Sequence, residues 1–253
     1  EKVFFDPVAS TFSRQPDSGP WGSDVEDSYA LFTGVVPAGR RDKVYASMID
    51  GVRKRGHTPI TGLITTGPFL QTLAEFGDAD DAYELMGREG FPGLRNLLRL
   101  SPDGVAEHFY VSPSDARNSM GSRCHAGLTG APFPWFYHVL GGLRPDDDQP
   151  GLKKFTLAPQ IPAKLESAGI THESPYGTIV SRWSQKDGQI AYDVTVPPNS
   201  TARVILPKAK AEQVRVDETS LDKAAGVSSI RQDNGLVSFD LAAGNYVFHW
   251  PAR

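Results

Sequence analysis

The sequence lacks the features that mark several large classes of protein. It contains a single cysteine, which excludes an internal disulfide and leaves the redox compartment open. No run approaches the ~18 apolar residues of a membrane-spanning helix, and the first residues, EKVFFDP, have no signal-peptide pattern. With 26 basic and 30 acidic residues the formal net charge is -4, so no cationic surface is indicated. We therefore expect neither nucleic acid nor a membrane as a partner.

The first part of the chain has the apolar spacing of helices joined by short turns. Four helices are predicted there, in an αα-hairpin pattern, at residues 25–36, 40–55, 61–76 and 79–89. Asp24 or Ser23 is placed to cap the first helix, and Asp78 to cap the fourth. Gly67-Pro68 is expected to interrupt the third helix near its start. One more helix, rich in aromatic residues, is predicted at residues 134–141.

The character of the chain changes at residues 146–151, where the acidic, turn-rich letters DDDQPG indicate a domain boundary. Short alternating runs follow, as expected of strands, at residues 154–158, 178–183, 189–196, 202–206, 213–216, 236–241 and 246–250. Lys186-Asp187-Gly188 has the composition of a hairpin turn. We predict a multidomain chain, with a helical domain over residues 1–145 and an antiparallel β-sandwich over residues 146–253.

The stretch from Gly104 to Pro145 holds most of the chemistry of the sequence. Glu107 lies in an apolar setting, GVAEHFYV, and histidine, arginine and a bulky aromatic segment follow it. Such a set suits a sugar site, because aromatic faces stack on pyranose rings and an acid moves protons. It also suits a loop with a solvated glutamate and core aromatics, and composition leaves both interpretations open. The helical part offers only this acid in an apolar context, and five helices do not close a barrel, so we predict a partial catalytic domain.

Several motifs together resemble a known family. They are the helix TTGPFLQTL, the spacing from the acid in GVAEHF to SRCH, the helix end LGGLRP, and SPYG at the opening of the sheet region. This order is similar to the C-terminal half of the alpha-L-rhamnosidases of glycoside hydrolase family 78. The resemblance implies part of an (α/α)6 barrel followed by the β-sandwich. It also implies inverting hydrolysis of terminal alpha-L-rhamnosyl or related deoxy-sugar residues from glycosides or polysaccharides, without a cofactor.

The resemblance implies roles for individual residues. Glu107 falls at the general base of the family, and His125 at a histidine that contacts substrate. Ala106 stands where the family usually has a tryptophan, which alters one wall of the sugar subsite. The general acid of the family is expected on the N-terminal remainder of the same enzyme, which becomes a partner of this chain. The candidate substrate-binding residues are His125, His108, Arg123, Asn118, Trp135 and Trp21.

Several of these residues have a structural interpretation as well. Trp135 is expected on an apolar helix face, where a core position is favoured, and Trp21 either packs or stacks on a sugar. Arg123 and Asn118 fit loop residues that meet solvent or backbone equally well. His125 also fits a histidine that is hydrogen-bonded to a backbone carbonyl.

Other chemistries are less favoured. A nucleophilic Cys124 beside His125 is disfavoured because sequence neighbours rarely reach the required geometry, and a small buried cysteine is expected instead. The histidines form no helical metal-binding pair, the run Asp146–Asp148 lacks a calcium-loop pattern, and no metal is expected. Asn199 begins a glycosylation sequon that matters only in a glycosylating secretory host.

Two further functions stay open beside the hydrolase. The chain could be a non-catalytic carbohydrate-binding or degenerate protein, which Ala106 slightly favours, or an accessory subunit whose site another polypeptide completes. A secreted or periplasmic location is favoured over a cytoplasmic one.

Overall fold

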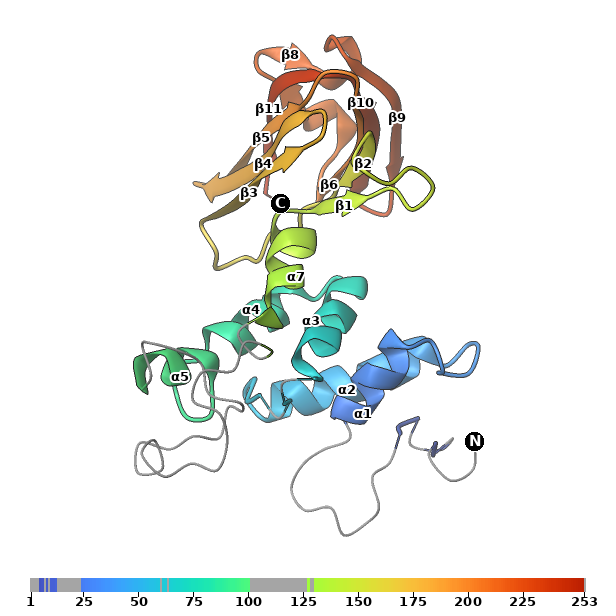
Figure 1. Cartoon of the computed structure of the whole chain (residues 1–253), viewed down its shortest axis with the longest axis vertical. Helices are drawn as coiled ribbons and strands as arrows, with labels where there is room; N and C mark the ends of the chain where they lie inside the picture. Colours follow the sequence, from blue (N-terminus) through green and yellow to red (C-terminus); the bar gives the residue numbers. More distant parts are fainter. Residues whose placement is uncertain are drawn as a thin grey trace. The chain divides into compact units, whose positions relative to one another are not determined.

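The computed structural model of the chain describes residues 5, 6, 8, 10–12, 24–59, 61, 62, 64–100, 127 and 130–252. It divides into two compact units, Glu1–Trp135 and Phe136–Arg253, of which the first is helical and the second is built from strands (Figure 1). The division lies inside the aromatic-rich segment, earlier in the sequence than the acidic link at residues 146–151. In the described part of the chain, no helix has the length and apolar character needed to cross a membrane.

The helical unit contains helices paired by short joints, as the apolar spacing predicts. Its helices are α1 (Asp24–Phe32), α2 (Arg41–Lys54), α3 (Thr66–Glu75), α4 (Ala79–Gly87), α5 (Leu94–Leu100) and α7 (Phe133–Trp135). Helix α1 packs on α2 and α3, α3 also contacts α4 and α7, and α4 contacts α5. Helix α5 was not predicted from the sequence.

Helix α2 follows its prediction closely and shows why the sequence folds this way. Val44, Met48 and Val52 recur at helical spacing, and all three are buried. The helix ends where Gly56 takes a φ of 59°, a left-handed conformation that favours glycine. The amides of Gly56 and His57 then donate to the carbonyls of Arg53 and Val52, at 2.9 and 3.0 Å.

Several details of the predicted helices are wrong, among them the start of α3, which lies at Thr66 rather than residue 61. Helix α1 ends at Phe32 rather than residue 36, because the chain turns at Gly34 with a φ of 74°. Gly67-Pro68 does not interrupt α3 but lies in its first turn, where the missing amide of proline has no helical acceptor to lose. Asp78 precedes α4 but makes no capping bond, since its carboxylate accepts the hydroxyl of Tyr45 instead.

The second unit consists of two sheets. One has the order β1 (Leu143–Pro145), β2 (Lys154–Leu157), β6 (Thr201–Pro207), β10 (Leu236–Leu241) and β9 (Val227–Asp233). The other has the order β3 (Ser167–Ser174), β4 (Gly177–Lys186), β5 (Gln189–Val196), β11 (Gly244–Pro251), β7 (Arg215–Val216) and β8 (Thr219–Ser220). Short 3-10 turns lie at Ala211–Gln213 and Leu221–Lys223. The prediction of a wholly antiparallel arrangement is wrong at one place, because β2 and β6 pair in parallel.

The two sheets face one another across an apolar core, as in a β-sandwich. Inward and outward residues alternate along β5, β6 and β10, so one face of each strand is buried. The rings of Phe239 on β10 and Phe248 on β11 lie 5.2 Å apart between centroids, which joins the two inner faces. The predicted hairpin turn is present between β4 and β5, with a φ of 50° at Asp187 and 75° at Gly188.

The predicted aromatic helix begins as α7 and continues as a π-helical turn, η1 (Phe136–Leu140), that belongs to the sheet unit. Backbone carbonyls at its end accept hydrogen bonds from residues of that unit. The indole N–H of Trp183 donates to the Leu140 carbonyl at 2.8 Å, and the hydroxyl of Ser181 donates to the Gly141 carbonyl at 2.6 Å. A side chain at Gly142 would clash, since its Cβ would stand 2.3 Å from the Pro159 nitrogen. The sheet unit therefore holds this turn as part of its own structure.

Candidate functional site

Most of the predicted site residues lie outside the part of the chain that the structure describes. These residues are Glu107, His108, Asn118, Arg123, His125 and Trp21, together with the neighbouring Ala106 and Cys124. Their roles stay predictions. The described residues instead show how polar and charged side chains are arranged in the same helical unit.

Trp135 is the one predicted site residue that the structure describes. It lies on α7 and is 1% exposed, so its ring is a core side chain of the helical unit. This burial agrees with the core interpretation of the apolar helix face.

The first turn of α3 borders the candidate stretch on its C-terminal side. A Cβ at Gly67 would stand 3.4 Å from the carbonyl oxygen of Ala131, so the described C-terminal part of the stretch lies against this turn. The turn itself is polar and buried. The hydroxyls of Thr61 and Thr66 lie 2.9 Å apart, and Thr66 also donates to the carbonyl of Gly62 at 2.8 Å. The TTG motif thus forms a hydrogen-bonded start of α3.

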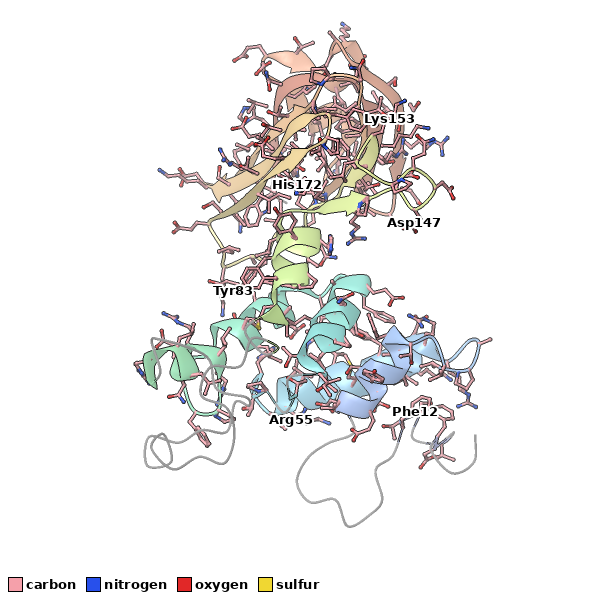
Figure 2. The ribbon with its side chains drawn as sticks, in the orientation of Figure 1. Phe12, Arg55, Tyr83, Asp147, Lys153 and His172 are labelled. Atoms are coloured by element: carbon pink, nitrogen blue, oxygen red, sulfur yellow. The ribbon has the colours of Figure 1, made fainter. Side chains whose placement is uncertain are left out.

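The helical unit buries more than one acid, contrary to the sequence analysis. Asp24 is 3% exposed and forms an ion pair with Arg55 of the α2 end, a residue labelled in Figure 2. Asp27 is fully buried and accepts the Thr11 hydroxyl at 2.8 Å and the Phe12 amide at 2.6 Å. The sequence did place these two acids three residues apart in the first turn of α1, and therefore near the same side of the helix. Their partners lie 15 or more residues away in the chain, so spacing alone did not show the burial.

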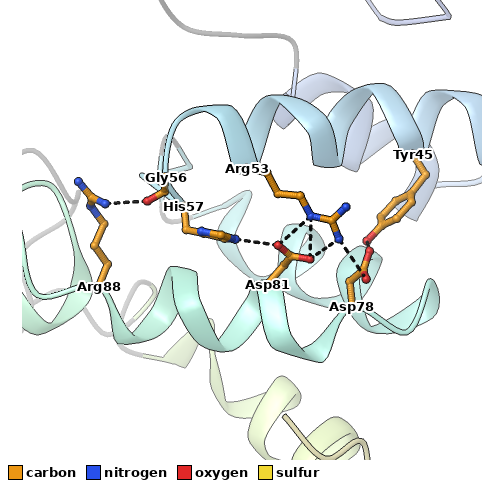
Figure 3. A network of polar contacts seen from close by, with 7 residues as sticks. All are labelled: Tyr45, Arg53, Gly56, His57, Asp78, Asp81 and Arg88. Atoms are coloured by element: carbon orange, nitrogen blue, oxygen red, sulfur yellow. Dashed lines mark hydrogen bonds and ion pairs between the residues drawn. The ribbon is translucent and has the colours of Figure 1, made fainter. Parts of the chain in front are cut away.

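A polar network joins α2 to α4 (Figure 3). Arg53 on α2 donates to the Asp81 carboxylate from Nη2 at 2.6 Å and from Nε at 3.1 Å, and its Nη2 lies 3.5 Å from Asp78. The Nε2 atom of His57 lies 2.7 Å from Oδ1 of Asp81, the same oxygen to which Nε of Arg53 donates. The hydroxyl of Tyr45 donates to Asp78. The positive charge of Arg53 is thereby paired with the two carboxylates of Asp78 and Asp81 where α2 and α4 meet.

The electrostatics of this network follow from its contacts. Burial raises the pKa of the Tyr45 hydroxyl, and the hydrogen bond to Asp78 raises it further. Burial alone would raise the pKa of Asp81, but the hydrogen bonds from Arg53 and His57 outweigh it and hold the pKa below its ordinary value. The Asp81 hydrogen bond raises the pKa of Arg53. Each charge is therefore stabilised by its neighbour.

This network fits a structural role better than a catalytic one. Its carboxylates are engaged by an arginine, a histidine and a tyrosine, and the arrangement contains no serine, cysteine or lysine nucleophile with an adjacent base. Among the residues that the structure describes, no group of three histidine, cysteine or acidic residues is placed to hold a metal ion. His57 instead orients Asp81, and His138 contacts the Leu143 carbonyl through Nδ1 at 2.7 Å.

Comparison with protein families covers most of the chain. Residues 13–140 match the model of the bacterial alpha-L-rhamnosidase 6 hairpin glycosidase domain. Residues 142–220 match the model of the bacterial alpha-L-rhamnosidase C-terminal domain. The two matches meet close to the division between the helical and sheet units.

Individual proteins of the same kind are similar over large parts of the chain. An alpha-L-rhamnosidase from Formosa agariphila is 28% identical over 191 residues, which are 74% of this chain and 20% of that protein. An alpha-L-rhamnosidase from Streptomyces avermitilis is 23% identical over 230 residues, 89% of this chain and 21% of that protein. The chain thus spans about a fifth of the length of these curated relatives.

Solved structures share the fold. The alpha-L-rhamnosidase from Dictyoglumus thermophilum superposes with a TM-score of 0.79 at 19% identity, over 91% of this chain and 25% of that one. The Streptomyces avermitilis enzyme complexed with L-rhamnose gives a TM-score of 0.75 at 22% identity, over 90% of this chain and 21% of that one. These likenesses extend across both units.

Proposed function

The chain belongs to the bacterial alpha-L-rhamnosidases, and we propose that it supplies the general-base half of an inverting site. The substrates would be glycosides or polysaccharides with terminal alpha-L-rhamnosyl or related deoxy-sugar residues. The observation that carries the proposal is the consecutive match of both family domains, of which the glycosidase domain includes Glu107. One structurally similar enzyme is complexed with L-rhamnose, which supports this class of sugar.

We further propose that the described helices are part of an (α/α)6 barrel. Support comes from the contacts of α1 with α2 and of α3 with α4, and from the match to a six-hairpin domain. The remaining hairpins and the general acid would then belong to the N-terminal remainder of the same enzyme. The relatives support this, because they are four to five times longer than the region they share with the chain.

In the proposed reaction Glu107 acts as the general base. An inverting glycosidase holds two carboxyl groups about 6.5–9.5 Å apart, which leaves room for a water molecule between the base and the sugar. Glu107 would take a proton from this water as it attacks the anomeric carbon, while the acid protonates the leaving oxygen. Phe109 and Tyr110 would partly desolvate Glu107, and His125, His108, Arg123 and Asn118 would donate to sugar hydroxyls.

The test is Glu107→Gln in the complete enzyme, assayed on an aryl alpha-L-rhamnoside. Removal of a general base should lower kcat by about 10²–10⁴-fold. Azide should restore turnover and yield a glycosyl azide of inverted configuration, which NMR identifies. Glu89→Gln is a matched control, because Glu89 is 71% exposed and should leave kcat unchanged. Hydrolysis by Glu107→Gln at a near-normal rate would contradict the assignment.

A non-catalytic sugar-binding protein is the second candidate, and Ala106 is the observation that favours it. A missing tryptophan removes a stacking surface beside the base, so binding without turnover would be a natural result. Calorimetric binding of L-rhamnose by a complete protein that hydrolyses none of a panel of aryl glycosides would favour this function. Measurable hydrolysis would exclude it.

A further inference from the structure

The turn between β5 and β6 carries a motif that the proposed function does not use. Asn199, Ser200 and Thr201 form a sequon, in which an asparagine is followed two residues later by a hydroxyl-bearing residue and the middle residue is not proline. This is the acceptor sequence for N-linked oligosaccharides. No other asparagine in the sequence has a serine or threonine two residues after it. The sequon is therefore unique in this chain.

The backbone of the sequon forms a type II turn. The Ser200 amide donates to the Pro197 carbonyl at 3.2 Å, which closes a four-residue turn with Pro198 and Asn199 at its centre. Proline is common at the first central position of a type II turn, and the second central position needs a positive φ, which asparagine tolerates. Asn199 has a φ of 61°. The sequence Pro-Pro-Asn-Ser thus places Asn199 at the corner of the turn.

The turn exposes the two residues of the sequon that take part in glycosylation and buries the one between them. Asn199 and Thr201 are exposed, whereas Ser200 is buried. Within the described part of the chain, the Asn199 side chain takes part in no hydrogen bond or ion pair. The turn is held by its backbone, since the Thr201 amide also donates to the Lys153 carbonyl at 3.0 Å. A group attached to the Asn199 amide would therefore displace no bond on which the turn depends.

We propose that Asn199 is a site of N-glycosylation when the chain passes through a secretory pathway that contains an oligosaccharyltransferase. The donor is a lipid-linked oligosaccharide pyrophosphate. The Nδ2 atom of Asn199 forms a bond to the anomeric carbon of the first sugar and loses one proton. The bond from that carbon to the pyrophosphate oxygen breaks, and the lipid pyrophosphate leaves. This inference goes beyond the rhamnosidase proposal and does not depend on it.

Asn234 offers an internal comparison on the same sheet unit. It lies on the turn between β9 and β10, is exposed and has a φ of 47°, so its backbone conformation resembles that of Asn199. The residue two positions later is Leu236, which has no hydroxyl. A difference in glycosylation between the two asparagines would therefore come from the sequon and not from exposure.

Secretion of the complete enzyme from yeast, followed by peptide mapping, tests the proposal. Trypsin cleaves after Lys186, Arg203 and Arg231, so Asn199 and Asn234 fall on different peptides. The peptide 187–203 should gain the mass of one oligosaccharide, and the peptide that begins at residue 232 should not. PNGase F should remove the oligosaccharide and convert Asn199 to aspartate, which digestion in heavy-oxygen water marks by mass.

Paired substitutions show that the hydroxyl at the second position is responsible. Thr201→Ala should abolish the mass gain on peptide 187–203, and Thr201→Ser should retain it, because serine keeps the hydroxyl. Leu236→Thr is the matched positive control, since it completes a sequon at Asn234 on an exposed turn and should add an oligosaccharide there.

Two results would overturn the proposal. The first is a secreted protein with an unmodified Asn199, and modification of Asn234 in Leu236→Thr would show that the same preparation met the transferase. The second is a mass gain on peptide 187–203 that persists in Asn199→Gln, which would assign the modification to a hydroxyl group. Assays on an aryl alpha-L-rhamnoside keep this inference separate from the proposed function. A glycosylated Asn199 in an inactive protein would remove only the hydrolase, and activity with an unmodified Asn199 would remove only the glycosylation site.

Discussion

The two units of the chain handle their apolar side chains differently. The sheet unit alternates strictly along its central strands and encloses Trp183, Phe239, Phe248 and Trp250, each at most 2% exposed. The helical unit buries Asp24 and leaves rings on α1 outward. The comparison teaches that the described sheet unit stabilises its core with aromatic and aliphatic side chains, whereas the described helical unit combines buried apolar residues with buried, ion-paired acids.

The most severe test of this comparison removes a core ring from the sheet unit. Phe239→Ala should reduce the free energy of unfolding of that unit by about 3–5 kcal/mol, because it removes transfer energy and leaves a cavity. Urea unfolding followed by tryptophan fluorescence measures the loss. Leu236→Ala on the same strand is the control and should stay within about 0.5 kcal/mol, since Leu236 is half-exposed. Similar losses for both would break the comparison.

A smaller effect is expected where the sheet unit holds η1. The Ser181 hydroxyl donates to the Gly141 carbonyl, so the Tyr192 hydroxyl, 2.7 Å away, donates to Ser181. Ser181→Ala leaves the Gly141 carbonyl and the Tyr192 hydroxyl without this partner. It should lower the free energy of unfolding of the sheet unit by about 1–3 kcal/mol. Chemical denaturation measures the change, and Ser184→Ala on the exposed side of β4 should have little effect. A neutral Ser181→Ala would show that the carbonyl end of η1 is not held through this bond.

The smallest effect is expected in the helical unit, and it should depend on pH. The pKa of Asp81 is lowered from 3.8, so its charge stabilises the folded state above that value and the contribution is lost as the pH falls through the lower, folded-state pKa. Asp81→Asn should cost up to about 1–3 kcal/mol at neutral pH. The difference from the unmodified chain should shrink as the pH falls below 3.8 and disappear below the folded-state pKa of Asp81, and urea midpoints across pH measure it. Asp80→Asn, at an exposed neighbour, should show no such dependence, and a constant difference for Asp81→Asn would refute the assignment.

A strand or helix could be predicted from the sequence where its own residues carry a regular pattern of apolar side chains. The strands at residues 189–196 and 236–241 coincide with β5 and β10, because one buried face imposes alternation on the sequence. Strand β3 was missed since its letters, SAGITHES, are small or polar and no residue in it is fully buried. Strand β9, VSSIRQD, was missed for the same reason. Helix α5 is short and follows Pro92, so its pattern was too brief to stand out.

The candidate site was predictable only through a family resemblance. The resemblance identified the family correctly from TTGPFLQTL, LGGLRP and SPYG, and the family models confirm it. Burial of Asp24 and Asp81 depends on ion pairs with Arg55 and Arg53, which lie on other helices, and no local pattern reports such pairings. The roles of Glu107 and His125 stay predictions.

The hydrogen bonds from β4 to the end of η1 determine where the sheet unit could be joined to the helical domain of a relative. The family domains meet between residues 140 and 142, yet the Leu140 and Gly141 carbonyls accept from Trp183 and Ser181 on β4. A chimera joined at that point would place a foreign helix end against these donors. A crossover at Phe136 instead carries the whole turn with its acceptors, so it is the natural breakpoint for transplanting this sandwich.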